Sequence, residues 1–123
     1  MEPTEIALDL AKAAPTCVVQ ARVGERKANR VRALVLDHGL LADLTGCDVS
    51  FECMGKGWHA VAQCEVDGSH AAFDLPVFDR AGDVTTAYIR VEKEGTVRTT
   101  GDFIIRVLRR EDAPCSPFAC NWT

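Results

Sequence analysis

The sequence predicts an all-β protein, an antiparallel β-sandwich of about seven to eight strands. Two long stretches, residues 84–92 and 96–108, alternate apolar and polar residues, which places every second side chain on one face of a sheet. Shorter apolar runs recur along the chain and are separated by Gly, Asp and Asn, the residue types that favour turns. After residue 15 no segment shows the periodicity of an amphipathic helix.

The N-terminal residues fit two secondary structures. Ile6, Leu8 and Leu10 alternate as in a strand, whereas the alanines of the segment 5–14 favour a helix. We expect residues 1–15 to form an extended arm. The strands that follow are expected at residues 16–23, 30–37, 47–53, 58–66, 70–75, 84–92 and 96–108.

The chain length of 123 residues is sufficient for one domain with a single core. We expect that domain over residues 16–110, followed by a tail at 111–123 that contains proline and cysteine. The formal net charge of −4 arises from 18 acidic and 14 basic residues without a basic cluster, which disfavours nucleic-acid binding. The first residues carry no basic segment, and no sustained apolar stretch follows them. We therefore expect neither a signal peptide nor a membrane span, and folding in a cytosol.

Two hairpins have a register that the sequence predicts. The loop 93–95 has Gly where a three-residue hairpin loop needs a positive φ angle. The Asp67-Gly68 dipeptide favours a type I′ turn. The first loop pairs Val91 with Val97, Ile89 with Thr99, Ala87 with Gly101 and Thr85 with Phe103. The second turn pairs Cys64 with Ala71, Ala62 with Phe73 and Ala60 with Leu75 on an inner face shared by Trp58, and Glu65 with His70 on the outer face.

The six cysteines separate into two groups. Four share the parity of apolar neighbours in predicted strands, and free cysteine packs as a small buried hydrophobe. The other two lie in the proline-containing tail and could bridge each other or a neighbouring chain after release into an oxidising environment. The inward group is Cys17, Cys47, Cys53 and Cys64, and the tail group is Cys115 and Cys120.

No constellation of residues indicates an enzyme, a metal site or a cofactor. In the predicted register His59 and His70 lie six residue steps apart, a span of roughly 20 Å and too far for a shared metal. The third histidine, His38, sits beside Gly39 in a predicted turn. There is no nucleophile elbow and no glycine-rich phosphate loop. A small cysteine- or metal-dependent enzyme is the least favoured class of function.

Several short motifs resemble, in order and spacing, the N-terminal domain of phage baseplate upper proteins. The first is Ala21-Arg22-Val23-Gly24-Glu25, followed by Asp43-Leu44-Thr45-Gly46-Cys47 leading into a strand. Later motifs are Phe73-Asp74-Leu75-Pro76, Ala81-Gly82-Asp83-Val84 and Thr99-Thr100-Gly101-Asp102-Phe103. The resemblance covers about residues 16 to 108 and implies an immunoglobulin-like sandwich.

The resemblance also implies a function: a non-enzymatic virion structural protein of a tailed phage or prophage, made in the bacterial host cytoplasm. Such a module anchors receptor-binding or fibre proteins to the tail, so its partners would be other tail or baseplate proteins, including a distal tail protein and a receptor-binding protein. A homo-oligomer is a further expectation. The alternative is a carbohydrate- or cell-surface-binding sandwich, a class that needs an exposed aromatic platform.

Five residues are the candidate interface. Tyr88, Arg90 and Arg98 share the outward parity of the long predicted hairpin and form either a docking surface or a solvated face. Phe118 and Trp122 lie in the tail, which is either a strap folded over the sandwich or an anchor for a neighbouring subunit.

Overall fold

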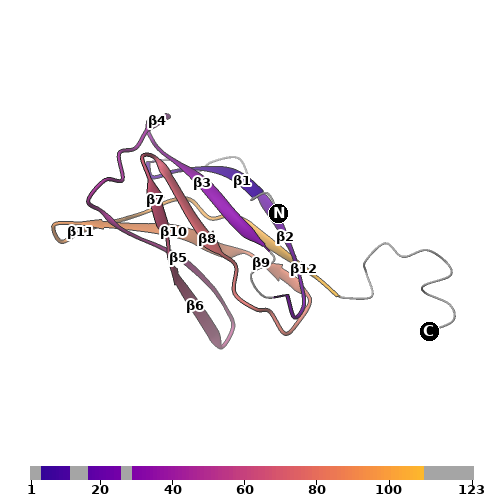
Figure 1. Cartoon of the computed structure of the whole chain (residues 1–123). Coiled ribbons are helices and arrows are strands. Elements are labelled where there is room, and N and C mark those ends of the chain that lie inside the picture. Colours follow the sequence, from indigo (N-terminus) through magenta and orange to yellow (C-terminus); the bar gives the residue numbers. More distant parts are fainter. Residues whose placement is uncertain (1–3, 12–16, 26–28, 110–123) are drawn as a thin grey trace, which may run out of the picture.

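The computed structural model describes residues 4–11, 17–25 and 29–109, and every regular element among them is a strand (Figure 1). This confirms the prediction of an all-β protein. The strands are β1 (Thr4–Asp9), β2 (Val18–Arg22), β3 (Arg30–Asp37), β4 (Leu40–Leu41), β5 (Asp48–Gly55), β6 (Trp58–Gln63), β7 (Glu65–Asp67), β8 (His70–Asp74), β9 (Gly82–Val84), β10 (Thr86–Lys93), β11 (Thr96–Thr99) and β12 (Ile104–Leu108).

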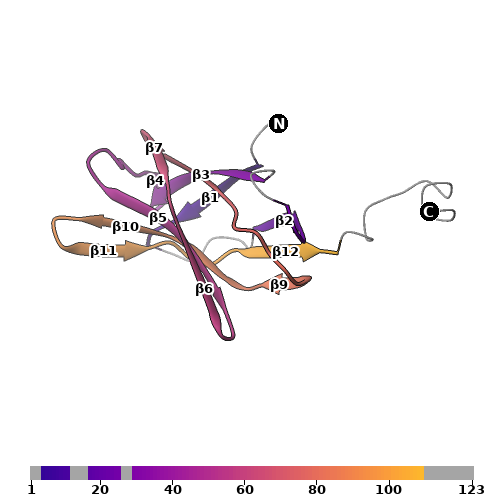
Figure 2. The same cartoon turned by 60° about the horizontal axis from the view of Figure 1, so that its bottom comes forward.

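The strands form three sheets in a sandwich-like arrangement (Figure 2). The five-stranded sheet has the order β1-β3-β8-β7, with β4 paired to β3. The four-stranded sheet has the order β11-β10-β5-β6, and the three-stranded sheet has the order β2-β12-β9. Most pairs are antiparallel, as predicted, but β1 pairs with β3 and β2 pairs with β12 in parallel. The immunoglobulin-like detail stays a prediction.

The expected strands lie close to the observed ones, with additions at the start (β1), between β3 and β5 (β4), and before β10 (β9). Residues 4–9 form β1, which pairs along β3 and buries Leu8 to 1% exposure. The boundary at residue 15 between arm and domain stays a prediction, as does the boundary of the tail. The expected strand 58–66 divides at Cys64, so β6 belongs to the four-stranded sheet and β7 to the five-stranded sheet.

Three phenylalanines join the sheets at the centre of the core. Phe51 comes from β5, Phe73 from β8, and Phe103 directly precedes β12; each is at most 1% exposed. The Phe51 and Phe73 rings are stacked with centroids 4.2 Å apart and an interplanar angle of 7°, and Phe103 lies 6.0 Å from Phe51. Side chains that alternate along β3, β5 and β10 supply much of the rest of the core, because period-two alternation directs them to one face.

The β10–β11 hairpin has a register other than the predicted one. The loop contains two residues, Glu94 and Gly95, both with positive φ (53° and 82°), which is the signature of a type I′ turn. Val91 therefore faces Arg98 instead of Val97. Ile89 faces Thr100 instead of Thr99, a shift of the same one residue. Ala87 and Thr85 lie beyond the end of β11 at Thr99, so their predicted pairs do not form within this hairpin.

A break after β11 explains the error. The amide of Thr100 donates to the carbonyl of Ile89 (3.0 Å), whereas the amide of Phe103 donates to the carbonyl of Ala87 (2.9 Å), so one extra residue lies on the side of Phe103. The Thr100 hydroxyl oxygen also accepts a hydrogen bond from the amide of Ile89 (3.0 Å). In β11 the even-numbered residue Arg98 lies on the inner side, opposite Val91. The break changes which residues face inward, so the odd-numbered Phe103 faces the core.

The turn before β8 also differs from the prediction. Asp67 pairs with His70, Val66 with Ala71 and Glu65 with Ala72, so the turn residues are Gly68 and Ser69. The observed pairing is shifted by two residues from the predicted one, so Ala71 faces Val66 instead of Cys64 and His70 faces Asp67 instead of Glu65. A shift of two residues leaves each side chain on its predicted side of the strand, and Ala71 is buried. Ala60 and Ala62 pair with Cys53 and Phe51 in the four-stranded sheet, not with Leu75 and Phe73.

Glu94→Asn tests the two-residue loop. Asparagine adopts a positive φ more readily than glutamate, and Asn-Gly is a preferred type I′ sequence. We expect the free energy of unfolding, measured by urea denaturation, to rise by about 0.5–1 kcal/mol. Glu92→Asn, in the strand, is the control and should not stabilise the protein. An equal effect at both positions would contradict the observed turn.

Candidate protein-interaction site

Tyr88 and Arg90 project from β10 on the side opposite the buried residues Ala87, Ile89 and Val91. The register places Tyr88 opposite Glu52 on β5, and Val61 of β6 lies across from Glu52 on its other side. The side chains on this side of the sheet form what we call the outer face of the four-stranded sheet: Glu52, His59, Val61, Tyr88, Arg90 and Glu92. This placement confirms that Tyr88 and Arg90 share one face.

The charges on this outer face are paired within it. Arg90 Nη2 lies 3.0 Å from a carboxylate oxygen of Glu92, and Arg90 Nε lies 3.9 Å from Glu52. His59 Nε2 lies 3.0 Å from the other oxygen of Glu52. Partial burial and the nearby carboxylates raise the pKa of Tyr88, so its phenol stays neutral and can donate a hydrogen bond at neutral pH. The face thus offers compensated charges, a phenol and the exposed Val61.

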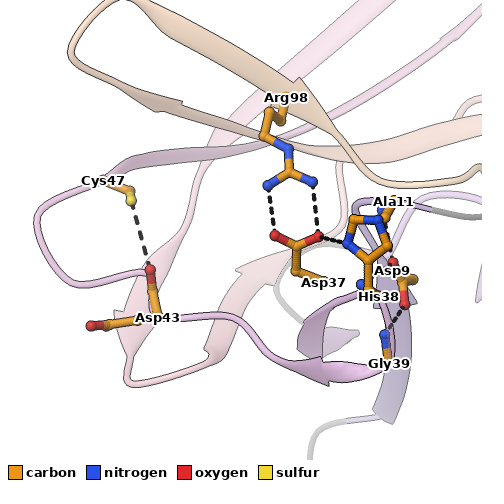
Figure 3. Close-up of polar contacts among 8 residues, drawn as sticks. All are labelled: Asp9, Ala11, Asp37, His38, Gly39, Asp43, Cys47 and Arg98. Carbon is orange, nitrogen blue, oxygen red and sulfur yellow. Dashed lines mark hydrogen bonds and ion pairs between the residues drawn. The ribbon is translucent and has the colours of Figure 1, made fainter.

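Arg98 lies on the opposite side of the sheet, which corrects the prediction that it shares a face with Tyr88 and Arg90. It faces Val91, a residue 8% exposed, and its guanidinium reaches the end of β3 in the five-stranded sheet. There it makes two parallel bonds to Asp37, at 2.7 and 2.9 Å (Figure 3). Arg98 therefore bridges two sheets. Two of its guanidinium nitrogens are engaged in this intramolecular ion pair and are not free to bind a partner protein.

The β3–β4 turn is fixed by a buried carboxylate. His38 and Gly39 both have positive φ (53° and 80°), as a type I′ turn requires. Asp9, 4% exposed at the end of β1, accepts hydrogen bonds from the amides of Ala11 (2.7 Å), His38 (3.2 Å) and Gly39 (2.8 Å) (Figure 3). His38 Nδ1 lies 2.9 Å from Asp37. The turn is thus tied both to β1 and to the Arg98 bridge.

The turn presents two exposed leucines that the sequence analysis did not single out. Leu40 and Leu41 form β4 and are 73% and 69% exposed, the highest values among the large apolar side chains described. They border a pocket of about 400 Å³ whose lining includes Leu10, Val91 and Arg98. The sequence contains a signal for this exposure, namely two adjacent leucines directly after a turn. Successive side chains of a strand point to opposite faces, so both cannot be buried on one side.

Trp58 is more exposed than predicted. It is 40% exposed, and it contacts the buried Phe78 edge-on with ring centroids 6.2 Å apart. A Cβ added at Gly55, its partner across the β5–β6 hairpin, would overlap the indole, so the ring lies close against the glycine backbone. Trp58 lines a groove of about 1030 Å³ between this hairpin and residues 76–86. Trp58 thus has the predicted inner-face position, but one side of its ring is exposed in this groove.

The cysteines described by the structure behave as packing residues. Cys53 and Cys64 are buried, and burial raises the pKa of each thiol to about 12, so neither is a thiolate at neutral pH. Cys17 and Cys47 are partly buried against the core. All four are free. The tail residues Cys115, Phe118, Cys120 and Trp122 lie outside the described residues.

His59 and His70 belong to different sheets, so the predicted separation along one ribbon does not apply to them. Within residues 4–11, 17–25 and 29–109, no cluster of three or more His, Cys, Asp or Glu side chains is arranged to hold a metal ion. The same residues contain no helix long and apolar enough to cross a membrane.

The Arg98 bridge predicts a stability loss in acid. Hydrogen bonds from Arg98, with a smaller effect of His38, lower the pKa of Asp37 from 3.8 to about 2. Because the folded pKa is below the unfolded one, the contribution is complete above pH ~4 and is lost as the pH falls towards 2. In urea denaturation at a series of pH values, we expect Asp37→Asn to be less stable than wild type above pH ~4, with the difference narrowing in acid. Asp67→Asn, at the exposed end of β7, is the control; a pH-independent deficit for Asp37→Asn would contradict the assignment.

The fold is similar to that of a solved structure, the N-terminal domain of phage TP901-1 ORF48. The match covers 85% of this chain and 98% of that domain, with a TM-score of 0.64 and 15% sequence identity. No family model matches the sequence. No curated protein matches it. At this identity the similarity is one of fold, and it agrees with the β-sandwich that the sequence resemblance implies.

Proposed function

We propose that this chain is a non-enzymatic structural module of a phage or prophage virion, which binds other proteins of the tail or baseplate. The observation that carries the proposal is the fold likeness, which extends over 98% of an N-terminal domain from a phage protein. The order of the sequence motifs between residues 16 and 108 supports the same assignment independently of the structure. In its finer form, the module is a baseplate or tail adaptor that anchors receptor-binding or fibre proteins.

The chemistry of the described residues supports binding. The two most buried thiols are protonated at neutral pH, and the ionised side chains around Arg90 and Arg98 are engaged in ion pairs. Surfaces of this kind, with an aromatic residue, an arginine and exposed aliphatic side chains, resemble protein interfaces in composition. We propose the outer face of the four-stranded sheet as a docking surface, and Phe118 and Trp122 of the tail as further contacts.

The docking role predicts a selective effect of charge reversal. The chain would be produced together with the tail proteins encoded beside it, and association measured by co-purification and calorimetry. We expect Arg90→Glu to weaken binding at least about tenfold, because it opposes Glu52 and Glu92 and removes an interface arginine. Arg106→Glu is the control, since Arg106 also forms a surface ion pair, with Asp83, but lies on β12.

Arg98 is unsuited to this experiment because its reversal would break the bridge to Asp37 and lower the stability of the fold as well. Failure of the wild-type chain to bind any of the neighbouring tail proteins would overturn the adaptor role. Equal weakening by Arg90→Glu and Arg106→Glu would overturn the choice of face while leaving the adaptor role in place.

A second candidate function, carbohydrate binding, is favoured by Trp58. Its half-exposed indole borders a groove that also contains Lys56, Asp79 and Arg80. Aromatic rings bordered by polar groups suit a sugar ring. Binding of the wild-type chain on a glycan array, lost in Trp58→Ala and retained in Arg106→Glu, would support this function. Absence of binding to any glycan would remove it.

A further inference from the structure

The β6 strand is an open edge of the four-stranded sheet. It pairs with β5 alone, and no described strand lies beyond it. The amide of Cys64 donates to the carbonyl of Val49 (2.9 Å), which sets the phase of the antiparallel ladder. Because hydrogen-bonded pairs alternate, Trp58, Ala60 and Ala62 bond to β5, whereas the backbone groups of His59, Val61 and Gln63 point to the free edge. Both views show the β5–β6 hairpin projecting from the body of the sandwich (Figures 1 and 2).

This edge lacks the features that protect the other outer strands. Charged side chains, proline and short length are the usual means of preventing edge-to-edge pairing. Among the described edge strands, β7 and β9 have three residues each and carry acids, β11 has four and carries Arg98, and β1 and β2 carry charged residues. β6 has six residues, Trp-His-Ala-Val-Ala-Gln, without Asp, Glu, Lys, Arg or Pro.

The sequence of β6 is also complementary to itself. When two copies are paired antiparallel about Val61, His59 faces Gln63 and Ala60 faces Ala62, so no like charges oppose each other. On the outer side, two valines that are each 58% exposed meet. On the inner side Ala60 meets Ala62, which leaves room for close approach of the two backbones there, and Trp58 would lie opposite Cys64 of the second copy at each end of the paired segment.

We propose that two copies of this chain associate through their β6 strands, in antiparallel register about Val61, to form a continuous sheet across a two-fold axis. The backbones of His59, Val61 and Gln63 in one copy would exchange hydrogen bonds with Gln63, Val61 and His59 of the second copy. Such an interface is isologous, as a two-fold axis requires. The proposal goes beyond the adaptor role and does not depend on it.

The expected affinity is low. A six-residue strand is about 20 Å long and buries less than the ~800 Å² per partner of a stable dimer. We therefore expect a reversible dimer that becomes populated on the order of 100 μM. A weak contact of this kind gains strength when many copies are already held in one assembly.

The experiment is sedimentation equilibrium of the full chain from 10 μM to about 1 mM, with reductant to exclude disulfides of Cys115 and Cys120. Wild type should shift from monomer to dimer with concentration. Val61→Lys should stay monomeric, because two lysines would face each other across the axis. The new lysine lies opposite Glu52 within the same copy, so the monomer itself keeps a favourable cross-strand pair.

Two variants control for the loss of an exposed valine. Val97→Lys makes the same exchange on β11, the opposite edge of the same sheet, and should dimerise like wild type. Val61→Thr keeps the strand neutral and β-branched and should also dimerise. Hydrogen exchange should show that the amides of His59, Val61 and Gln63 gain protection with concentration. A monomeric wild type at 1 mM, equal dimerisation of Val61→Lys, or equal loss in Val97→Lys would overturn the proposal.

Discussion

The contact on which the rest of the molecule depends is the phenylalanine cluster that joins three sheets. Phe51, Phe73 and Phe103 each come from a different sheet region, and the stacked pair fixes β5 against β8. Close packing of large buried rings permits few alternative arrangements of the two layers, the four-stranded sheet that contains β5 and the five-stranded sheet that contains β8. The positions of the outer face, the Arg98 bridge and the open β6 edge all follow from that arrangement. The bridge adds a polar connection between the same two layers at their periphery.

Strand positions could be predicted from the sequence, but strand partners only in part. Alternation along 84–92 identified β10 because every second residue there is buried. Alternation specifies the two faces of a strand and contains no information on which sheet the strand joins. The chain changes sheets at Cys64 and again between β11 and β12, and both changes occur inside stretches predicted as single strands. The predicted hairpin registers were wrong from the turns onward, because the turn residues are Gly68-Ser69 and Glu94-Gly95.

The same physics separates the interface residues that were placed correctly from those that were not. Tyr88 and Arg90 lie within one uninterrupted strand, so their shared face follows from parity alone. Arg98 lies beyond the turn, and a loop of two residues instead of the expected three reverses the side of the sheet on which it lies. The exposure of Leu40 and Trp58 depends on what packs against them, which no local pattern contains. The exposure of these side chains is thus determined by tertiary contacts, which local sequence patterns do not predict.

An open strand edge usually endangers solubility, yet β6 has properties that limit association to a specific and weak contact. Ala60 and Ala62 on its inner side are packed against the core and Trp58 packs against Phe78, so pairing adds little apolar area on that side. His59 is held by Glu52 and Gln63 donates to Asp48 (2.8 Å), which places acidic groups beside the edge on the neighbouring strand. Repeated stacking would require a second open edge, and the far edge of the sheet carries Arg98 on a four-residue strand. Pairing of two β6 strands is therefore closed by symmetry, which distinguishes a dimer from an aggregate.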